Sequence, residues 1–217
     1  MVTEKDIIIR KFVVEDGEAI RRITFDTAFL GEPASIFFDD EEIFADALSL
    51  YFTDYEPESC FVAVFNEKVI GYIFGTKNIP KMNRTFILKI IPGLGIKAIR
   101  RGTLFRKKVN QFLMYCAKSF LKGELNTPNF SKQYPATFHI NIDKDFRGLH
   151  IGANLLEHYL QYLKENNVTG VQCSTISEGA KIFFEKMGFY VLYEIKRSYW
   201  RSYTGKDFSY YVLGKIL

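Results

Sequence analysis

The chain has 217 residues, of which 47% are hydrophobic and 16% aromatic, enough for a sizeable core and too much for a disordered chain. Its net charge of +4 is too small to indicate nucleic-acid binding by itself. The three cysteines (Cys60, Cys116 and Cys173) form no CxxC pair, which argues against a disulfide framework or a metal site. Without a recognisable signal peptide or an apolar run of roughly 20 residues, we expect a cytoplasmic protein that binds no membrane.

The first part of the chain predicts a strand, two helices and a hairpin. Residues 6–13 read as a first strand, and residues 15–30 carry a rough apolar stripe of helical spacing. Residues 39–55 begin with acids, which stabilise the N-terminus of a helix through its dipole. Residues 59–76 consist of two apolar runs around a short polar turn, which indicates a β-hairpin.

A segment of about 55 residues, 79–134, departs from this alternation after Pro80. Within it, residues 96–123 have a helical pattern, in two pieces around Gly102, and residues 124–135 read as a loop. A segment of this size is more than a turn, so we expect an inserted helical subdomain or lid.

The second half predicts alternating strands and helices. In chain order these are a strand (136–142), a helix (151–167), a strand (170–175), a helix (177–188) and two closing strands (189–200 and 208–217). Together with the first half, this order indicates a mixed α/β class with a central sheet.

Charge is distributed in two opposite blocks. Residues 36–58 contain eight acids and no base, whereas residues 81–108 contain nine bases and no acid. Such blocks are often solvated faces, but they can also set the polarity of a cleft or pair with each other.

Residues 147–152, RGLHIG, follow a predicted strand and open a predicted helix. The first N–H groups of a helix lack intrahelical partners and carry partial positive charge, which favours a phosphate. Arg147 adds a charged donor, while His150 stands in place of a second glycine, and its Cβ disfavours the positive φ that glycine adopts easily. The spacing also fits any tight turn between a strand and a helix, so both interpretations stay open.

Two stretches of the second half resemble the GNAT superfamily of acyl-CoA-dependent N-acetyltransferases. The loop 147–152 is similar to the family's cofactor motif Arg/Gln-x-x-Gly-x-Gly/Ala, with Arg147 at its first position and Gly152 at its last. The stretch 180–189, AKIFFEKMGF, is similar to the family's Ala-x-x-Phe-Tyr-Glu-Lys-x-Gly-Phe. The two motifs follow in the family's order and lie on the expected kinds of element.

The resemblance is strong over about 137–190, fair over 1–79 and absent over 80–134. It implies a GNAT-like fold of the α/β (α+β mixed) class, in which helices flank a central mixed, mostly antiparallel sheet. The helical insertion at about 80–134 then lies between the third and fourth strands of a single domain, 1–217.

The resemblance also implies a binding site for acetyl-CoA in the second half. The strand 138–143 would part from its neighbour and offer backbone groups to the pantetheine arm, and the amides of 147–152 would hold the pyrophosphate. The helix 177–187 would pack against the thiol end. The residues implied in cofactor binding are Ile140, Asn141, Ile142, Arg147, Gly148, Leu149, His150, Ile151, Gly152, Ala153, Ser177, Ala180, Phe183 and Phe184.

Acetyl transfer needs a base, because an ammonium acceptor must lose a proton before it attacks the thioester. His139 and Asp143 lie on one face of the predicted strand and are the candidates, although His139 could be structural and Asp143 could cap the next loop. Phe184 stands where many members have the tyrosine that serves as general acid, and Ser177 stands where many have asparagine. A tyrosine near the C-terminus could replace the acid, the choice being among Tyr199, Tyr203, Tyr210 and Tyr211.

The predicted function is transfer of an acetyl group from acetyl-CoA to a primary amine of a small molecule or peptide, by direct attack in a ternary complex. The alternative is a non-catalytic module that binds CoA, which Phe184 favours. The acids of residues 39–42 suggest a cationic acceptor, unless they only stabilise a helix N-terminus. We expect the basic insertion to cover the phosphates, to meet an anionic partner or to form a homodimer, and we expect no nucleic-acid partner.

Overall fold

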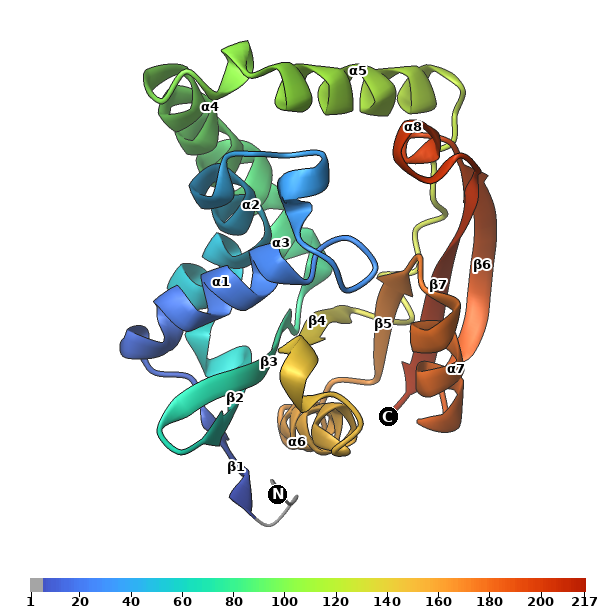
Figure 1. Ribbon diagram of the computed structural model, residues 1–217. Helices are drawn as coiled ribbons and strands as arrows, with labels where there is room; N and C mark the ends of the chain where they lie inside the picture. The colour runs from blue at the N-terminus through green and yellow to red at the C-terminus, as the bar shows by residue number, and fades with distance from the viewer. Residues whose placement is uncertain (1–5) are drawn as a thin grey trace.

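The computed structural model describes residues 6–217, which form one seven-stranded sheet with helices on both faces (Figure 1). The strand order is β1-β2-β3-β4-β5-β7-β6, and all neighbours are antiparallel except β4 and β5, which run parallel. The strands are β1 (Ile8–Lys11), β2 (Cys60–Phe65), β3 (Lys68–Thr76), β4 (Ala136–Ile142), β5 (Gly170–Thr175), β6 (Tyr190–Arg197) and β7 (Phe208–Ile216). The predicted mixed, mostly antiparallel sheet is confirmed.

Helices α1 and α2 pack on one face of the sheet, and α6 packs on the other (Figure 1). The helices are α1 (Gly17–Asp26), α2 (Glu41–Tyr55), α3 (Ile79–Thr85), α4 (Ile91–Arg100), α5 (Lys107–Leu121), α6 (Ile151–Glu165), α7 (Glu178–Lys186) and α8 (Arg201–Thr204). None of the helices in residues 6–217 has the length and hydropathy that crossing a membrane requires.

Helix α6 shows why the periodicity of the sequence is informative here. Leu155, Leu156, Tyr159 and Leu163 recur at helical spacing, and all four are completely buried against the sheet. Their burial fixes α6 on this face, and its first turn lies next to α7, because a Cβ placed on Gly152 would be 3.6 Å from the ring of Phe183.

Strands β4 and β5 separate soon after they begin. Their parallel register joins only two pairs, Ala136 with Val171 and Thr137 with Gln172. On its other side, β4 remains paired with β3 as far as Ile142. The sheet therefore opens between its two parallel strands.

The direction of the backbone groups beside this opening follows from the β3 ladder. The N–H of Asp143 donates to the carbonyl of Ile70 on β3 at 2.8 Å. Backbone groups alternate in direction along a strand, so the N–H and C=O groups of Ile140 and Ile142 face away from β3. They point to the side on which β5 has already diverged.

The predicted helical insertion between β3 and β4 is confirmed. It contains α3, a π-helical turn (Phe86–Ile90), α4 and α5, and the last two are separated at Gly102, which has a φ of 67°. Pro80 occupies the first turn of α3, where the missing N–H of proline costs nothing. In Figure 1, α5 runs across one end of the molecule between α4 and α8.

Opposite charges hold this insertion against α2. Lys97 of α4 donates to Asp46 at 2.6 Å and pairs with Glu42 at 2.5 Å. Arg101 pairs with Glu42 at 2.5 Å and with Asp40 at 3.2 Å. The acidic and basic blocks thus pair with each other, which is one of the interpretations that the sequence left open.

Candidate functional site

The loop between β4 and α6 presents free backbone donors. Helix α6 begins at Ile151, and its first backbone bond runs from the N–H of Asn154 to the carbonyl of His150. The N–H groups of Ile151, Gly152 and Ala153 therefore precede the first intrahelical bond, and His150 supplies no side-chain cap. This helix end lies beside the opening between β4 and β5, so it can receive an anion there.

The loop uses two left-handed residues, of which only one is a glycine. Gly148 has a φ of 85° and His150 has a φ of 55°. The Cβ of His150 disfavours positive φ, as the sequence indicated, yet the residue adopts it. The residue adopts this conformation because α6 must start at Ile151, at a cost of about 1–2 kcal/mol.

Arg147 connects this loop to the loop that follows α1. Its Nε lies 3.4 Å from the carbonyl oxygen of Ile142, and its Nη2 lies 3.3 Å from that of Gly31. The side chain thus contacts both a backbone group of the opening and a segment from the other face of the sheet. No carboxylate among residues 6–217 forms an ion pair with it, so its charge is available to a ligand.

Some side chains of α7 pack in the core, and others border the loop at the start of α6. A Cβ placed on Gly152 would lie 3.6 Å from the ring of Phe183, so this ring borders the start of α6. Phe184 is only 5% exposed and meets Phe138 edge-to-face at 5.6 Å. Ser177 caps α7 by accepting from the N–H of Ala180 at 3.2 Å.

A directional chain of hydrogen bonds reaches His139. The hydroxyl of Thr24 donates to the carbonyl of Ile20 at 2.7 Å, so it accepts from the hydroxyl of Tyr72, also at 2.7 Å. The amide Nδ2 of Asn141 donates to the Tyr72 oxygen at 2.9 Å and to Nε2 of His139 at 3.0 Å. His139 therefore carries its proton on Nδ1, and its Nε2 lone pair is occupied.

His139 is a neutral group at neutral pH. Its ring stacks near Phe74 at 5.6 Å and Tyr72 at 6.3 Å, and burial lowers its pKa to about 4. The imidazole therefore remains neutral at pH 7, but its low pKa makes it a weak base.

Asp143 has the alternative task that the sequence suggested. Its side chain accepts from the N–H of Asp145 at 3.2 Å and thereby begins the turn before α6. Lys68 lies 3.8 Å from the carboxylate. The residue orders the loop, and its service as a base stays a prediction.

The four C-terminal tyrosines are all engaged in contacts. The hydroxyl of Tyr211 donates to Glu178, and Tyr210 lies under the guanidinium of Arg197 at 3.4 Å. Tyr199 and Tyr203 pack around Trp200, and the hydroxyl of Tyr203 is buried without a hydrogen-bond partner. These contacts single out none of the four tyrosines as the general acid.

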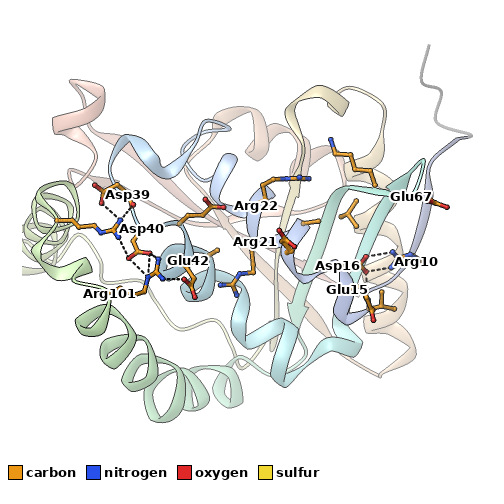
Figure 2. Close-up of a pocket in the computed structure, with 18 residues that line it drawn as sticks. Arg10, Glu15, Asp16, Arg21, Arg22, Asp39, Asp40, Glu42, Glu67 and Arg101 are labelled. Carbon is orange, nitrogen blue, oxygen red and sulfur yellow. Dashed lines mark hydrogen bonds and ion pairs between the residues drawn. The ribbon is translucent and has the colours of Figure 1, made fainter.

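A cavity of about 1060 Å³ lies away from the opening, along α1 and the start of α2 (Figure 2). The wall carries both acids and bases, and Figure 2 shows several of them paired, among them Arg10 with Asp16 and Arg101 with Asp40. Its lining includes no residue of β4, α6 or α7. This cavity is a charged surface groove, separate from the implied cofactor site.

Asp40 shows why the acids of this groove do not mark an obvious cation site. The residue is 1% exposed and accepts from Thr103, from Arg101 and, as the cap of α2, from the N–H of Ile43. Burial alone would raise the pKa of Asp40, but these hydrogen bonds and the charge of Arg106 lower it below its ordinary value. The bases of the insertion therefore already neutralise most of the acidic charge that was suggested to attract a cationic acceptor.

A second cavity, of about 550 Å³, was not anticipated from the sequence. It lies between the start of α3, the return segment 127–131 and the face of β4, β5 and β7, and its lining has no charged residue. The sequence offered no signal for it, because residues 124–135 read only as a loop and the cavity forms where that loop meets three strands. Among residues 6–217, no group of His, Cys, Asp and Glu could hold a metal ion.

Comparisons with known proteins agree with this geometry. Residues 106–189 match the family model described as "Acetyltransferase (GNAT) family". The fold is similar to that of SsHAT, with a TM-score of 0.70, 22% identity, and 97% of this chain and 98% of that chain covered. No curated protein matches the chain in sequence.

Two further solved structures are similar in fold at lower identity. The ribosomal-protein-alanine N-acetyltransferase from Brucella melitensis has a TM-score of 0.57 and 15% identity, with 97% of this chain and 99% of that chain covered. The polyamine N-acetyltransferase of Drosophila melanogaster has a TM-score of 0.58 and 12% identity, with 98% and 100% covered.

The family match includes the whole segment from α5 to α7, so it contains both the loop before α6 and the helix that borders it. The sheet that opens between β4 and β5 extends the agreement to the fold. Residues 106–189 are thus similar to the acetyltransferase (GNAT) family, and the fold of the chain is similar to that of SsHAT.

Proposed function

We propose that the protein transfers an acetyl group from acetyl-CoA to a primary amine. The observation that carries the proposal is the opening between β4 and β5 beside an uncapped helix end with three free N–H groups. The opening supplies an edge for an extended ligand, and the helix end supplies a site for its phosphates. Acetyl-CoA has both parts, and it would bring the acetyl group as a reactive thioester.

The residues of the loop would share the work of binding. The N–H groups of Ile151, Gly152 and Ala153 would meet the pyrophosphate, and Arg147 would exchange its two carbonyl contacts for a phosphate oxygen. The free backbone groups of Ile140 and Ile142 would pair with the amides of the pantetheine arm. None of these contacts requires a glycine at position 150.

In the proposed reaction, the amine nitrogen forms a bond to the acetyl carbon as the carbon–sulfur bond breaks. The amine loses one proton and the departing thiolate can take one up. We place the proton acceptor at His139, which lies on β4 and is unprotonated at neutral pH; its Nε2 can take up the proton only once the amide of Asn141 releases it. Its low pKa means that it assists a neutral amine and cannot deprotonate an ammonium group efficiently.

The position of Phe184 supports departure of the thiolate without a dedicated acid. The ring is packed against Phe138 and Phe189 and carries no proton donor. A thiolate is a tolerable leaving group, so the reaction slows but does not stop without an acid.

Two measurements test the proposal. A thermal shift with acetyl-CoA asks whether the cofactor binds, and thiol release with pools of amines asks whether it is consumed. Binding together with amine-dependent thiol release is the expected result. Binding without turnover across a broad amine screen would support the alternative, a CoA-binding module without catalysis, which the buried Phe184 favours.

The amine classes of the screen can follow the structural neighbours. One neighbour acts on polyamines and another on an alanine of a ribosomal protein, by the names that they carry. Both are amines, and we propose an amine acceptor for this chain as well. The homodimer expected from the sequence stays a prediction.

A further inference from the structure

A buried arginine without a counterion lies beside the uncharged cavity, in contact with two of its lining residues but not itself part of the lining. Arg197, the last residue of β6, is 8% exposed. Its guanidinium carbon lies 3.4 Å above the ring of Tyr210, and its Nη2 donates to Thr127 at 3.1 Å. Both of these neighbours line the cavity of about 550 Å³.

Part of the hydrogen-bonding capacity of Arg197 is unused. A guanidinium has five N–H donors, and the Nε of Arg197 is buried without a partner. Tyr199 is its other polar neighbour; burial raises the pKa of that phenol, and Arg197 opposes the rise. None of the ion pairs in residues 6–217 includes Arg197.

A positive charge in this position is costly to the free protein. Removal of a charge from water costs several kcal/mol unless a partner of opposite charge compensates it. The fifteen residues that line the cavity include no acid, so no residue of the wall can be that partner. A bound anion would compensate the charge and use the free donors.

The register of the sheet places Arg197 on the face that carries the cavity. Arg197 lies opposite Phe208 on β7, two residues from Tyr210, and side chains of a strand alternate between the faces. Tyr210 and Val212 of β7 both line the cavity. Arg197 therefore extends the same face at its β6 edge.

The other end of the cavity reaches the opening between β4 and β5. Thr137 and Gln172 line it and form the last pair before these strands diverge. His139 lies two residues further along β4 on the same face, a rise of about 7 Å. A ligand held near Arg197 and extended along this face would reach the proposed site of acetyl transfer.

We propose that this cavity binds a carboxylate of the acceptor with Arg197 as its counterion, so that the acceptor is an amino acid or a similar amine whose carboxylate lies several bonds from the reacting nitrogen. A single buried arginine in neutral surroundings compensates one negative charge, as a carboxylate has. A phosphate dianion would need a second positively charged group. Carboxylate binding stands on the cavity itself, and the role of the amine rests on the proposed acetyl transfer.

Binding is tested on the full chain with 6-aminohexanoate and with hexylamine, which lacks the carboxylate. By calorimetry, we expect 6-aminohexanoate to bind and hexylamine not to bind. Arg197→Gln is expected to weaken the binding by about tenfold or more, whereas Lys196→Gln is expected to leave it unchanged. Lys196 is a matched control, because it is the adjacent positive charge on the opposite, exposed face of β6.

Equal binding of 6-aminohexanoate by Arg197→Gln and the wild type would overturn the proposal, as would equal binding of hexylamine. Inorganic phosphate is the third probe. If phosphate binds more tightly than 6-aminohexanoate in an Arg197-dependent way, the carboxylate assignment is wrong. Failure of all three probes to bind would also overturn it.

Stability separates a binding role of Arg197 from a structural one. Because the charge is uncompensated in the free protein, we expect Arg197→Met to unfold at the same temperature as the wild type or higher. 6-Aminohexanoate should raise the unfolding temperature of the wild type and not that of Arg197→Met. A markedly lower unfolding temperature of the free variant would assign the arginine to folding and contradict the proposal.

Turnover links the cavity to the reaction. L-Lysine and cadaverine differ only in the carboxylate, and thiol release from acetyl-CoA is followed with each. We expect kcat/KM to be at least about tenfold higher for lysine, through KM, and the difference to vanish in Arg197→Gln. Equal rates for both amines would refute the inference while acetyl transfer stands. Absence of thiol release with every amine tested would refute the proposed function, and the binding data would still decide on the cavity.

Discussion

The amide of Asn141 donates to Nε2 of His139 at 3.0 Å, and this contact defines the state of the histidine. The second amide proton is used by Tyr72, whose own proton goes to Thr24. The chain of donors can run in one direction only, because Thr24 already donates to a helix carbonyl. Asn141 thus holds His139 as a neutral ring with its proton on Nδ1.

This state predicts a pH dependence of stability. The pKa of His139 is about 4 in the folded protein and about 6.5 in the unfolded chain, so the unfolded chain takes up the proton first as the pH falls. Neutral His139 therefore imposes no loss of unfolding free energy above pH 6.5. As the pH falls towards 4, the free energy of unfolding decreases progressively, by up to about 3 kcal/mol. Unfolding by urea from pH 4 to 7 should show this loss in the wild type and a smaller one in His139→Gln. Parallel curves for the two proteins would contradict the lowered pKa.

His150→Gly is expected to keep or improve the affinity for CoA. The wild-type residue has a φ of 55°, which costs a residue with a Cβ about 1–2 kcal/mol and costs glycine little. Gly148→Ala is the matched control, since its Cβ would meet open space and only the φ of 85° would be strained. Calorimetry should therefore show a weaker affinity for CoA in Gly148→Ala and not in His150→Gly. A loss of about tenfold in His150→Gly would mean that the imidazole is itself a ligand.

Arg147→Gln is expected to weaken CoA binding by about tenfold or more, because one charge-assisted contact to a phosphate is lost. The side chain is exposed and bonds only to the carbonyls of Ile142 and Gly31, so folding should be little affected. Lys144→Gln removes an exposed charge from the same loop and should change the affinity much less. Equal losses in both variants would indicate general attraction of an anion without a specific contact.

Phe184→Tyr is expected to lower stability without raising turnover. The ring is 5% exposed in a cluster with Phe138 and Phe189, where a new hydroxyl would be buried without a partner, at a cost of about 1–3 kcal/mol. Phe183→Tyr is the control, because that ring is only partly buried and its hydroxyl can reach water. Chemical unfolding and thiol release measure the two effects. A stable Phe184→Tyr protein with faster turnover would show that this ring reaches the thiol.

Asp40→Asn is expected to loosen the insertion from α2. The carboxylate is buried and receives Thr103, Arg101 and Arg106, so loss of its charge should cost about 2–4 kcal/mol. Asp39→Asn should cost little, because that side chain is 40% exposed and lies 3.9 Å from Arg106. Denaturant unfolding compares the two variants. If they are equally stable, the ion pairs do not hold the insertion in place.

Local patterns in the sequence were enough to predict most of the elements, the insertion and the resemblance to the family, but not α3 or α8. The buried stripe of α6 and the motif of α7 each lie within a few turns of a single helix. They can therefore be recognised without knowing which residues pack against them. The capping alternative for Asp143 was equally local, since its partner is two residues away.

Contacts between distant segments could be decided only by the tertiary structure. The pairing of Asp40 with Arg101 joins residues 61 positions apart, and it replaced a suggested acceptor site by an internal contact. The occupied lone pair of His139 depends on Tyr72 of another strand, and the left-handed φ of His150 depends on where α6 docks. Arg197 read as one more charge of a closing strand, because burial without a counterion is a property of the folded neighbourhood and is not encoded at one position.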